Sequence, residues 1–205
     1  MKNIIALIGT GILLSCSAQN GKTQSKNLSN LNRAYFASGC FWCVEAIFES
    51  VKGVEEAVSG YAGGNEQNPS YQQVSAGKTG HTETVVVYYD STQIDYKTLL
   101  KVFYGSHNPT TVNGQHPDYG TQYRSAIFYT SKYQKTLAVS FKDSLDNSGS
   151  YAEKIATEIS PLKRFWEAEE YHQDYEKTNP NQPYVRAVSI PRLNRFKEKF
   201  PELLK

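Results

Sequence analysis

Apolar and polar residues between positions 33 and 130 recur in two different periods, which predict strands and helices in turn. Apolar or alternating runs rich in β-branched and aromatic residues predict four strands: Ala34–Ser38, Val54–Tyr61, Thr82–Tyr89 and Tyr123–Tyr129. Apolar residues at helical spacing predict two helices, Cys40–Val51 and Asp95–Ser106. The order β-α-β-β-α-β predicts an α+β protein with a ferredoxin-like split β-α-β core, a two-layer sandwich.

The remaining segments are predicted to form long loops and C-terminal extensions. Two polar, glycine-bearing stretches, 65–80 and 107–122, are predicted loops. Later apolar patterns predict a helix at Ser131–Leu145, a weak strand at Ile155–Ser160 and a short helix at Trp166–Glu176. The basic tail 191–205 is amphipathic, and we expect it to dock on the domain as a helix. No repeat or linker interrupts positions 33–205, so one domain is predicted there.

The N-terminus has the pattern of a targeting segment. Lys2 precedes an apolar run, Ile4–Leu14, that is too short to span a bilayer. The stretch Leu13-Leu14-Ser15-Cys16 resembles the cleavage box of bacterial lipoproteins, and a generic secretory signal is the alternative. We predict a signal peptide at 1–15, a lipidated Cys16 and a flexible tether over 16–32. The protein would then be an extracytoplasmic, membrane-anchored lipoprotein of the periplasm or cell surface.

The composition limits which binding partners and which cysteine chemistry are expected. The 205 residues carry a net charge of +2, so no nucleic-acid partner is expected. We also expect the protein to be a monomer. Of the three cysteines, a lipidated Cys16 leaves only Cys40 and Cys43. A disulfide between residues this close in sequence closes a small loop and stabilises little. Redox cycling or metal binding is therefore the expected role of the pair.

Cys40 stands at a predicted strand-to-helix turn, where Gly39 permits a sharp change of direction. Unpaired amide groups and the dipole at a helix start favour a thiolate, so we expect Cys40 to be the reactive thiol. Phe41 and Trp42 follow it, and both rings cannot face the core together with Val44. At least one ring is expected at the surface beside Cys40, where it would line an apolar substrate pocket.

Glu83 is a candidate general acid. It lies in the predicted strand Thr82–Tyr89, on the same face as Val85 and Val87. If that face is covered, burial without a positive partner raises the pKa of the carboxyl and keeps its proton available. The alternative is a glutamate at a strand start that points into water. The two loops add polar groups that could converge on the first helix: Tyr71, Asp118, Tyr119 and Tyr123.

Motifs spread over residues 33–184 make the sequence resemble the peptide methionine sulfoxide reductase A family. They are Gly39-Cys40-Phe41-Trp42, Gly60-Tyr61-Ala62-Gly63-Gly64, Asn68-Pro69-Ser70-Tyr71, Thr79-Gly80-His81-Thr82-Glu83, Gly120-Thr121-Gln122-Tyr123-Arg124-Ser125, and Tyr171-His172-Gln173-Asp174-Tyr175 with Asn179-Pro180. Each motif alone is weak evidence, but the set in this order is highly specific.

The resemblance implies an oxidoreductase that reduces methionine S-sulfoxide, free or protein-bound, to methionine. Cys40 would attack the sulfoxide sulfur and become a sulfenic acid, while Glu83 protonates the sulfoxide oxygen. A second thiol then forms a disulfide that a thioredoxin-like partner reduces. No metal or organic cofactor is expected, because the electrons come from thiols. With the predicted anchor, the enzyme would repair oxidised exported proteins.

The resemblance also assigns roles around the two reacting groups. It implies that Tyr71 and Tyr123 hydrogen-bond the sulfoxide oxygen. It implies that Phe41 and Trp42 hold the methyl group of the substrate, and that Asp118 helps to order the same site.

The sequence departs from the common family pattern at Cys43. Family members usually have glycine there and a resolving cysteine in a glycine-rich C-terminal tail, whereas no cysteine follows Cys43 here. Either Cys43 resolves the oxidised Cys40, or an external thiol does so, or Cys43 is a small buried apolar residue. Thiols at i and i+3 on an intact helix need local distortion to reach bonding distance. We take Cys43 as the candidate resolving residue.

Two other functions fit part of the sequence. A thioredoxin-like disulfide oxidoreductase shares the Cys-x-x-Cys at a helix start, although Trp42 lies between the cysteines instead of before them. A zinc site built on Cys40, Cys43 and a histidine such as His81 is the second alternative. The other histidines are expected to be ordinary loop or surface residues: His107, His116 and His172.

Overall fold

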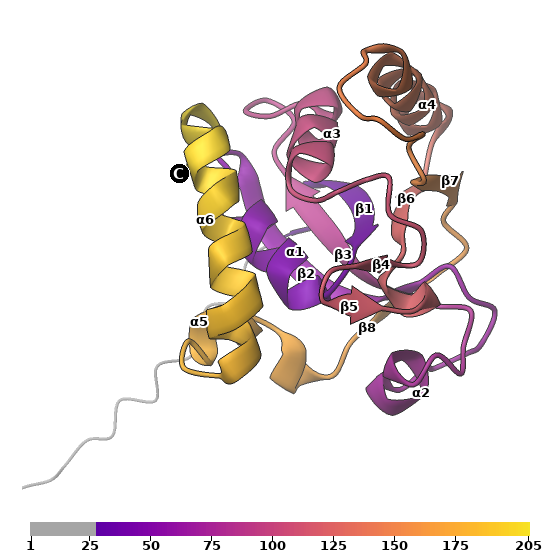
Figure 1. The fold of residues 1–205 in the computed structure, drawn as a ribbon, viewed down its shortest axis with the longest axis vertical. Helices are drawn as coiled ribbons and strands as arrows, with labels where there is room; N and C mark the ends of the chain where they lie inside the picture. Colours follow the sequence, from indigo (N-terminus) through magenta and orange to yellow (C-terminus); the bar gives the residue numbers. More distant parts are fainter. Residues whose placement is uncertain (1–27) are drawn as a thin grey trace, which may run out of the picture.

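The computed structural model describes residues 28–205 (Figure 1). The predicted signal peptide, the candidate lipidation site Cys16 and the tether up to residue 27 lie outside this range. Among the described residues, no helix is both long and apolar enough to cross a membrane. The described chain has a mixed α/β fold.

A six-stranded sheet with the order β7-β6-β1-β3-β2-β8 forms the centre of the fold. Its strands are β1 (Asn32–Ser38), β2 (Val54–Ala62), β3 (Thr82–Tyr89), β6 (Ser125–Tyr129), β7 (Glu158–Pro161) and β8 (Phe165–Glu167). Neighbouring strands are antiparallel except β6 and β7, which are parallel. The four strands predicted between residues 34 and 129 are all present and occupy the middle of the sheet as β6-β1-β3-β2.

Between residues 28 and 205, four helices are longer than one or two turns: α1 (Phe41–Glu49), α3 (Tyr96–Gly105), α4 (Lys132–Asn147) and α6 (Ile190–Lys199). Helix α1 connects β1 with β2, and α3 lies between β3 and β6 in the chain. In Figure 1, α6 runs along α1 on one side of the molecule, and α4 lies beside α3 on the other. The helix predicted at 131–145 is confirmed as α4.

Side chains of β1 alternate between the two faces of the sheet. Phe36 belongs to the larger core, whereas its neighbour Tyr35 packs on the opposite face. The Phe36 ring stacks on Phe48 of α1 and on Phe103 of α3, with centroid distances of 5.0 and 5.1 Å. Both helices therefore cover the same face of the sheet, and their aromatic contacts bury the core between them.

The strand register brings the end of β1 next to the beginning of β3. The two strands are antiparallel, and Phe36 lies opposite Val85. Extending this register by two residues places Ser38, the last residue of β1, beside Glu83. Since Cys40 follows two residues after Ser38, the pairing of β1 with β3 puts Cys40 and Glu83 at the same edge of the core.

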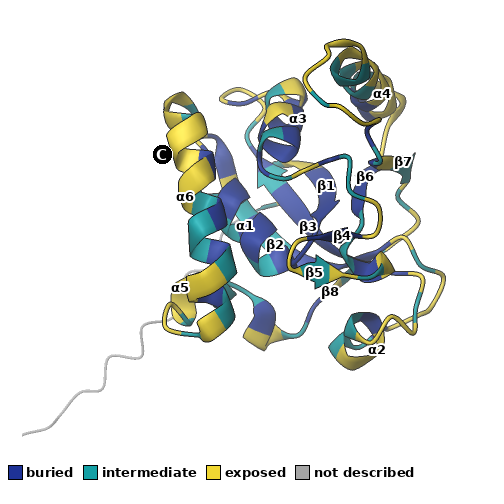
Figure 2. Cartoon of the chain, viewed as in Figure 1, coloured by how far each residue is buried: buried dark blue, intermediate teal, exposed yellow. Residues whose placement is uncertain are grey.

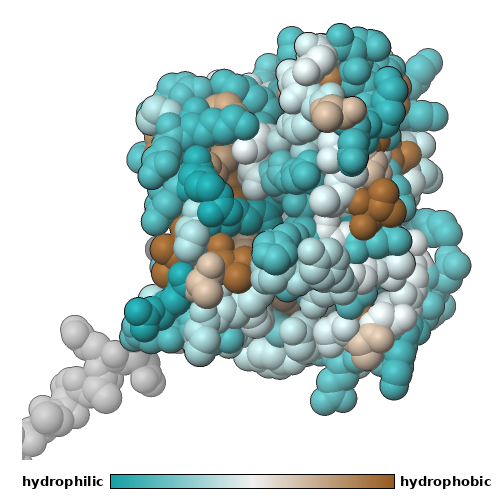
Figure 3. Space-filling view, in the orientation of Figure 1, coloured by the Kyte–Doolittle hydropathy of each residue, from teal (hydrophilic) through white to brown (hydrophobic). Residues whose placement is uncertain are grey.

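The C-terminal tail is docked as a helix, as predicted. A π-helix, η3 (Val185–Ser189), continues directly into α6. Helix α6 buries Arg192 and Phe196 against the domain, and its opposite side is exposed (Figure 2). The face of the molecule in Figure 3 is mainly hydrophilic, with small separate groups of apolar side chains.

The last residues of the chain pair with the end of α1. The Lys52 amide donates to the Leu203 carbonyl at 2.9 Å, and the Lys205 amide donates to the Ser50 carbonyl at 3.0 Å. A β-bridge joins Val51 to Leu204 between these two bonds. The C-terminus is therefore held against the helix that begins after Cys40.

The two predicted loops contain short regular elements. Residues 65–80 include α2 (Tyr71–Ser75), which begins with a capping box formed by Ser70 and Gln73. Residues 107–122 include the two-stranded hairpin of β4 (Gly114–Gln115) and β5 (Asp118–Tyr119). These elements position Tyr71 and Asp118, which free loops would leave unrestrained.

The prediction of a short helix at Trp166–Glu176 is wrong. This segment begins with β8, which pairs with β2 so that Gly60 lies opposite Glu167. A Cβ atom on Gly60 would lie 2.3 Å from the Trp166 carbonyl oxygen, so only glycine allows this close approach. Pairing with the edge of β2 thus outweighs the local helical pattern. The helical residues that follow form two separate short turns, the 3₁₀ helix η2 (Glu170–His172) and α5 (Tyr175–Thr178).

Candidate active site

Cys40 lies in the turn between β1 and α1. Gly39 has a φ of 86°, and a Cβ atom there would lie 2.8 Å from Cβ of Gln115, so the turn requires glycine. Cys40 is the N-cap residue, and α1 begins at Phe41 instead of at Cys40 as predicted. The Cys40 side chain is buried and is a free thiol. The thiol is therefore fixed outside the helix, over its first turn.

The expected thiolate at Cys40 is not favoured in this state of the protein. Burial raises the pKa of Cys40, and the neighbouring Cys43 and the carboxylates of Glu83 and Asp118 raise it further. The favourable electrostatics of the helix N-terminus do not offset the cost of ionising a thiol that is buried beside two acidic groups. Cys40 is accordingly a neutral thiol near pH 7.

Glu83 is buried in the site, so the alternative of a glutamate that points into water is wrong. Its side chain is only 2% exposed. One carboxylate oxygen accepts a hydrogen bond of 3.0 Å from the amide of Phe41, the residue after Cys40. Burial raises the pKa of Glu83 to about 8 against the effect of this hydrogen bond. Glu83 therefore keeps its proton at neutral pH and can donate it.

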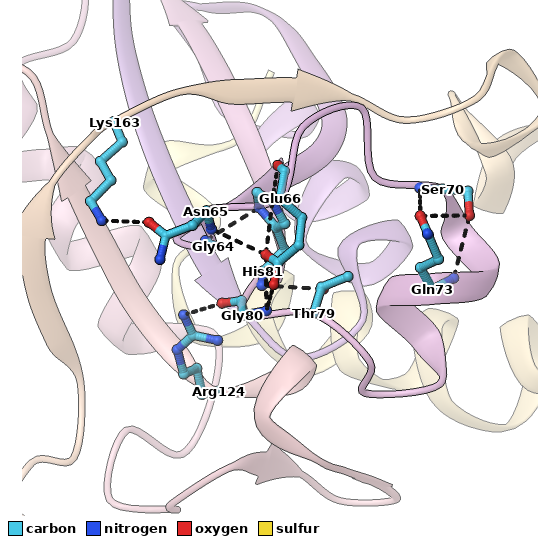
Figure 4. A network of polar contacts seen from close by, with 10 residues as sticks. All are labelled: Gly64, Asn65, Glu66, Ser70, Gln73, Thr79, Gly80, His81, Arg124 and Lys163. Atoms are coloured by element: carbon cyan, nitrogen blue, oxygen red, sulfur yellow. Dashed lines mark hydrogen bonds and ion pairs between the residues drawn. The ribbon is translucent and has the colours of Figure 1, made fainter.

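A polar network fixes the turn that leads into Glu83 (Figure 4). His81 Nε2 lies 2.9 Å from the Glu66 carbonyl, and His81 Nδ1 accepts from the Gly64 amide at 3.3 Å. The Arg124 guanidinium donates to the Gly80 carbonyl at 3.2 Å. Both ring nitrogens of His81 are thus used to hold the turn, which leaves the zinc alternative without its proposed histidine ligand.

Tyr71 and Tyr123 bring two hydroxyl groups to the same place. Both side chains are half-buried, and burial raises the pKa of each, to about 12 for Tyr71. The charges of Glu83 and Cys40 contribute to both shifts, so both hydroxyls lie close to the acid and the thiol. Each phenol is protonated and can donate a hydrogen bond.

Asp118 also belongs to the site, whereas Tyr119 does not. Asp118 accepts a hydrogen bond from the Tyr184 hydroxyl, and burial raises the pKa of its carboxyl. Tyr119 is 72% exposed, and its hydroxyl lies 3.2 Å from Nδ1 of His116. The alternation along β5 sends these two neighbours in opposite directions.

Phe41 and Trp42 form the apolar part of the site. Phe41 is fully buried, with its ring next to those of Tyr71 and His172. Trp42 keeps partial exposure, stacks on Tyr175 at a centroid distance of 3.8 Å, and donates from Nε1 to His172 Nδ1 at 3.1 Å. Trp42 is therefore the ring that lies at the surface beside Cys40, and its orientation is fixed from two sides.

The segment 169–175 holds this apolar surface in place, and its role was missed from the sequence. His172 was expected to be an ordinary surface residue, but it is 1% exposed and bonded to Trp42. Glu169 accepts from the Tyr71 amide at 2.9 Å and from the Tyr61 hydroxyl at 2.8 Å. The motif Tyr171-His172-Gln173-Asp174-Tyr175 was the one available sign that these residues belong to the site.

Cys43 lies directly below Cys40, in the first turn of α1, and is 1% exposed. Cys40 is the N-cap residue of α1 and Cys43 is the third residue of this helix. The two thiols interact, and a hydrogen bond from Cys40 lowers the pKa of Cys43 to about 7. The nearby charge of Arg192 acts in the same direction. Cys40 lies outside the helix, so helical geometry constrains only Cys43 of the pair.

The arrangement combines a thiol, a buried acid, two phenols and an aromatic wall within one site. Its hydrogen-bond donors can bind a polar oxygen of a ligand. The Cys40 sulfur can then attack the ligand atom that is bonded to this oxygen.

Comparisons with known proteins agree with this chemistry. A family model described as "Peptide methionine sulfoxide reductase" matches residues 32–204. "Peptide methionine sulfoxide reductase MsrA" of Pasteurella multocida is 47% identical over 173 residues, which cover 84% of this chain and 98% of that protein. Among solved structures, reduced Mxr1 from Saccharomyces cerevisiae is 35% identical with a TM-score of 0.69 and covers 73% of this chain and 86% of its own. Mxr1 in complex with Trx2 matches at 24% identity and a TM-score of 0.51, over 75% of this chain and 91% of that one, which is a likeness of fold alone.

Proposed function

Because this chain belongs to the peptide methionine sulfoxide reductase family of oxidoreductases, we propose that it reduces methionine S-sulfoxide through a sulfenic acid on Cys40. The observation that carries this mechanism is the protonated, buried Glu83 on the Phe41 amide, next to Cys40. The substrate is free or protein-bound methionine sulfoxide, with the S configuration at sulfur.

In the first step, the oxygen moves from the substrate sulfur to Cys40. The sulfoxide oxygen carries much of the negative charge of the S–O bond, and Tyr71 and Tyr123 donate hydrogen bonds to it. Glu83 transfers its proton to this oxygen as the sulfur of Cys40 bonds to the substrate sulfur, and the proton lost by the Cys40 thiol is taken up by Glu83. Methionine leaves, and Cys40 is left as a sulfenic acid.

The protonation of Glu83 also helps Cys40 to ionise. A charged Glu83 raises the pKa of Cys40, and this repulsion disappears when Glu83 carries its proton. The same proton thus serves the leaving oxygen and favours the attacking thiolate. Phe41 and Trp42 hold the substrate methyl group, and Asp118 orders the site through Tyr184.

The sulfenic acid is converted to a disulfide by Cys43, and a thioredoxin-type protein then reduces this disulfide. Support comes from the contact between Cys40 and Cys43 and from the solved complex of the related Mxr1 with Trx2. The electrons come from thiols, so the cycle needs no metal or organic cofactor.

The domain acts as a monomer at a membrane, outside the cytoplasm, where it repairs exported proteins. The lipoprotein-type cleavage box at Cys16 and the polar tether up to residue 32 support this location. A Cys16→Ala variant is expected to move from the membrane fraction to the soluble fraction, and equal membrane association of both proteins would contradict it. The strand order β6-β1-β3-β2 with α1 and α3 on one face supports the ferredoxin-like description of the core.

Single-turnover reduction tests the function. The reduced enzyme is mixed with an excess of a peptide that carries one methionine S-sulfoxide, without added thiol, and methionine is counted. We expect one equivalent of methionine, none with Cys40→Ser, and none from the R epimer. Absence of methionine together with reduction of insulin disulfides would favour the disulfide oxidoreductase instead.

A further inference from the structure

A cleft with a volume of about 500 Å³ opens beside the thiol site. One of its walls is the C-terminal segment of η3 and α6. The other wall is formed by the end of α3 and by the β4–β5 hairpin (Figure 1). Ligand pockets in proteins usually have volumes of about 300–1,000 Å³. The cleft is therefore large enough to take up a polar group of a ligand.

The inner end of the cleft adjoins the active site. Asp118 and Tyr184, which are hydrogen-bonded to each other, line the cleft as well as the site. Gln115 of the hairpin wall touches the turn before Cys40, because a Cβ atom on Gly39 would lie 2.8 Å from Cβ of Gln115. A ligand group in the cleft would therefore lie next to a substrate that is bound at Cys40.

The α6 wall carries three positively charged side chains, those of Arg192, Arg195 and Lys199. They follow one another at intervals of three and four residues and therefore share one face of the helix. Arg192 is 9% exposed, and its guanidinium bonds to Ser38, two residues before Cys40. The side chains of Arg195 and Lys199 are exposed. The charges thus extend from the inner end of the cleft to its mouth.

Within residues 28–205, no carboxylate forms an ion pair with these three side chains. The Arg192 guanidinium donates to two carbonyl oxygens and one hydroxyl group, all of them uncharged acceptors. Among the described residues, one acid lines the cleft, Asp118, and it already accepts a hydrogen bond from Tyr184. The cleft therefore has an excess of positive charge.

The opposite wall is held in shape by its own hydrogen bonds. The Gln115 side-chain amide donates to the Asn108 carbonyl at 2.7 Å and accepts from the Asn108 amide at 3.1 Å. His107 uses both ring nitrogens, one at the Phe103 carbonyl and one at the Ser125 hydroxyl. Burial lowers the pKa of His107 to about 3, so this side chain is uncharged at pH 7. The wall is pre-formed, and the positive charge of the cleft comes from α6.

We propose that this cleft is an anion subsite, in which Arg195 and Lys199 bind a carboxylate of the substrate peptide with the buried charge of Arg192 behind them. Guanidinium and ammonium groups both form charge-assisted hydrogen bonds with carboxylates. The carboxylate belongs to a glutamate or aspartate near the methionine sulfoxide, or to the C-terminus of the peptide. This inference rests on the proposed function, because it concerns the substrate of that reaction.

The test measures single turnover of the reduced full chain without added thiol or thioredoxin, so that a partner protein cannot cause the effect. The peptides are blocked at both ends and carry one methionine S-sulfoxide with two glutamates or two glutamines, placed before or after it. A glutamine peptide with a free C-terminal carboxylate tests the second source of the anion.

Exposed ion pairs contribute a factor of about 1.4–5 each. Two of them predict a second-order rate constant about 2–25-fold higher for a glutamate peptide than for its glutamine counterpart. A gain with the free C-terminus alone would assign the subsite to peptide ends. Because both cations are exposed, about 0.5 M salt should remove most of the preference.

The double variant Arg195→Gln with Lys199→Gln removes the two exposed charges of the cleft, and the ratio of the glutamate to the glutamine rate constant should fall to about one to two. Lys177→Gln with Lys197→Gln is the matched control. It removes two exposed positive charges that line a different cavity, between α1, α5 and α6, and should keep the ratio of the parent. Arg195→Glu with Lys199→Glu should reverse the preference in favour of peptides that carry lysine.

Equal rate constants for all peptides in the parent would overturn the subsite, while the proposed reductase activity stands. A preference that persists in the Arg195 and Lys199 variant, or that is lost equally in the control, would also overturn it. If that variant lowers only turnover with added thioredoxin, the cleft serves the partner protein and the substrate role is wrong. Absence of methionine with every peptide would instead refute the proposed function itself.

Discussion

Replacing Glu83 by glutamine is the sharpest test of the chemical step. Glutamine keeps the size of the side chain and an oxygen that can accept the Phe41 amide bond, now 3.0 Å long, so the ground-state geometry should persist. What disappears is the acidic proton. With a pKa of about 8, about nine-tenths of Glu83 is protonated at pH 7. Loss of a general acid lowers the rate on the order of 10²–10⁴-fold, or about 3–5 kcal/mol in activation free energy.

The assay is rapid-quench single turnover of an S-sulfoxide peptide, with methionine quantified between pH 6 and 10. In the parent the rate should lose its acid-dependent contribution above pH 8, where Glu83 ionises and its charge raises the pKa of Cys40. The Gln variant should lack this loss. Glu45→Gln is the matched control, because Glu45 is equally buried and burial raises its pKa to about 8 as well, but it bonds to Ser59 away from the thiols. A decrease below tenfold for Glu83→Gln, or an equal decrease for Glu45→Gln, would refute the assignment.

Three further predictions concern stability and substrate binding. Burial favours the protonated form of Glu45 in the folded state, so the free energy of unfolding decreases as the pH rises from about 4.5 to 8. Urea unfolding of Glu45→Gln should show a smaller decrease over this range. The same dependence of unfolding free energy on pH in both proteins would contradict this prediction. Gly60→Ala would place Cβ 2.3 Å from the Trp166 carbonyl; we expect the free energy of unfolding to fall by about 1–3 kcal/mol, and no change in urea midpoint would argue against this packing. His172→Leu leaves Nε1 of Trp42 without its acceptor; KM for the peptide should rise several-fold with a smaller change in kcat, and an effect on kcat alone would be inconsistent with a positioning role.

That Glu83 lies on the same face of its strand as Val85 and Val87 was predictable, because this depends on a local pattern. The period of two in β1 and β3 fixes which residues face the core, and antiparallel pairing brings Glu83 to the end of β1. The sequence also indicated an exposed ring beside Cys40. Whether that ring was Phe41 or Trp42 depended on the residues that surround each one, which the pattern does not contain.

The C-terminal contributions could not be predicted in the same way. Residues 165–175 have a helix-like composition, but a glycine in β2, Gly60, makes strand pairing available to them. Arg192 has the sequence context of a solvent-exposed helical residue, and only the docking of α6 makes it buried. The ionisation of Cys40 was predicted wrongly for a related reason, since its acidic neighbours Glu83 and Asp118 come from distant strands.

The pairing of residues 203–205 with the end of α1 has a consequence for the stability of this helix. Lys205 and Leu203 bond to the far end of the helix that begins after Cys40, although neither residue approaches the thiols. The end of α1 is therefore supported by residues that lie far from it in the sequence. Loss of residues 203–205 would remove these bonds and loosen the end of that helix without removing any group of the site.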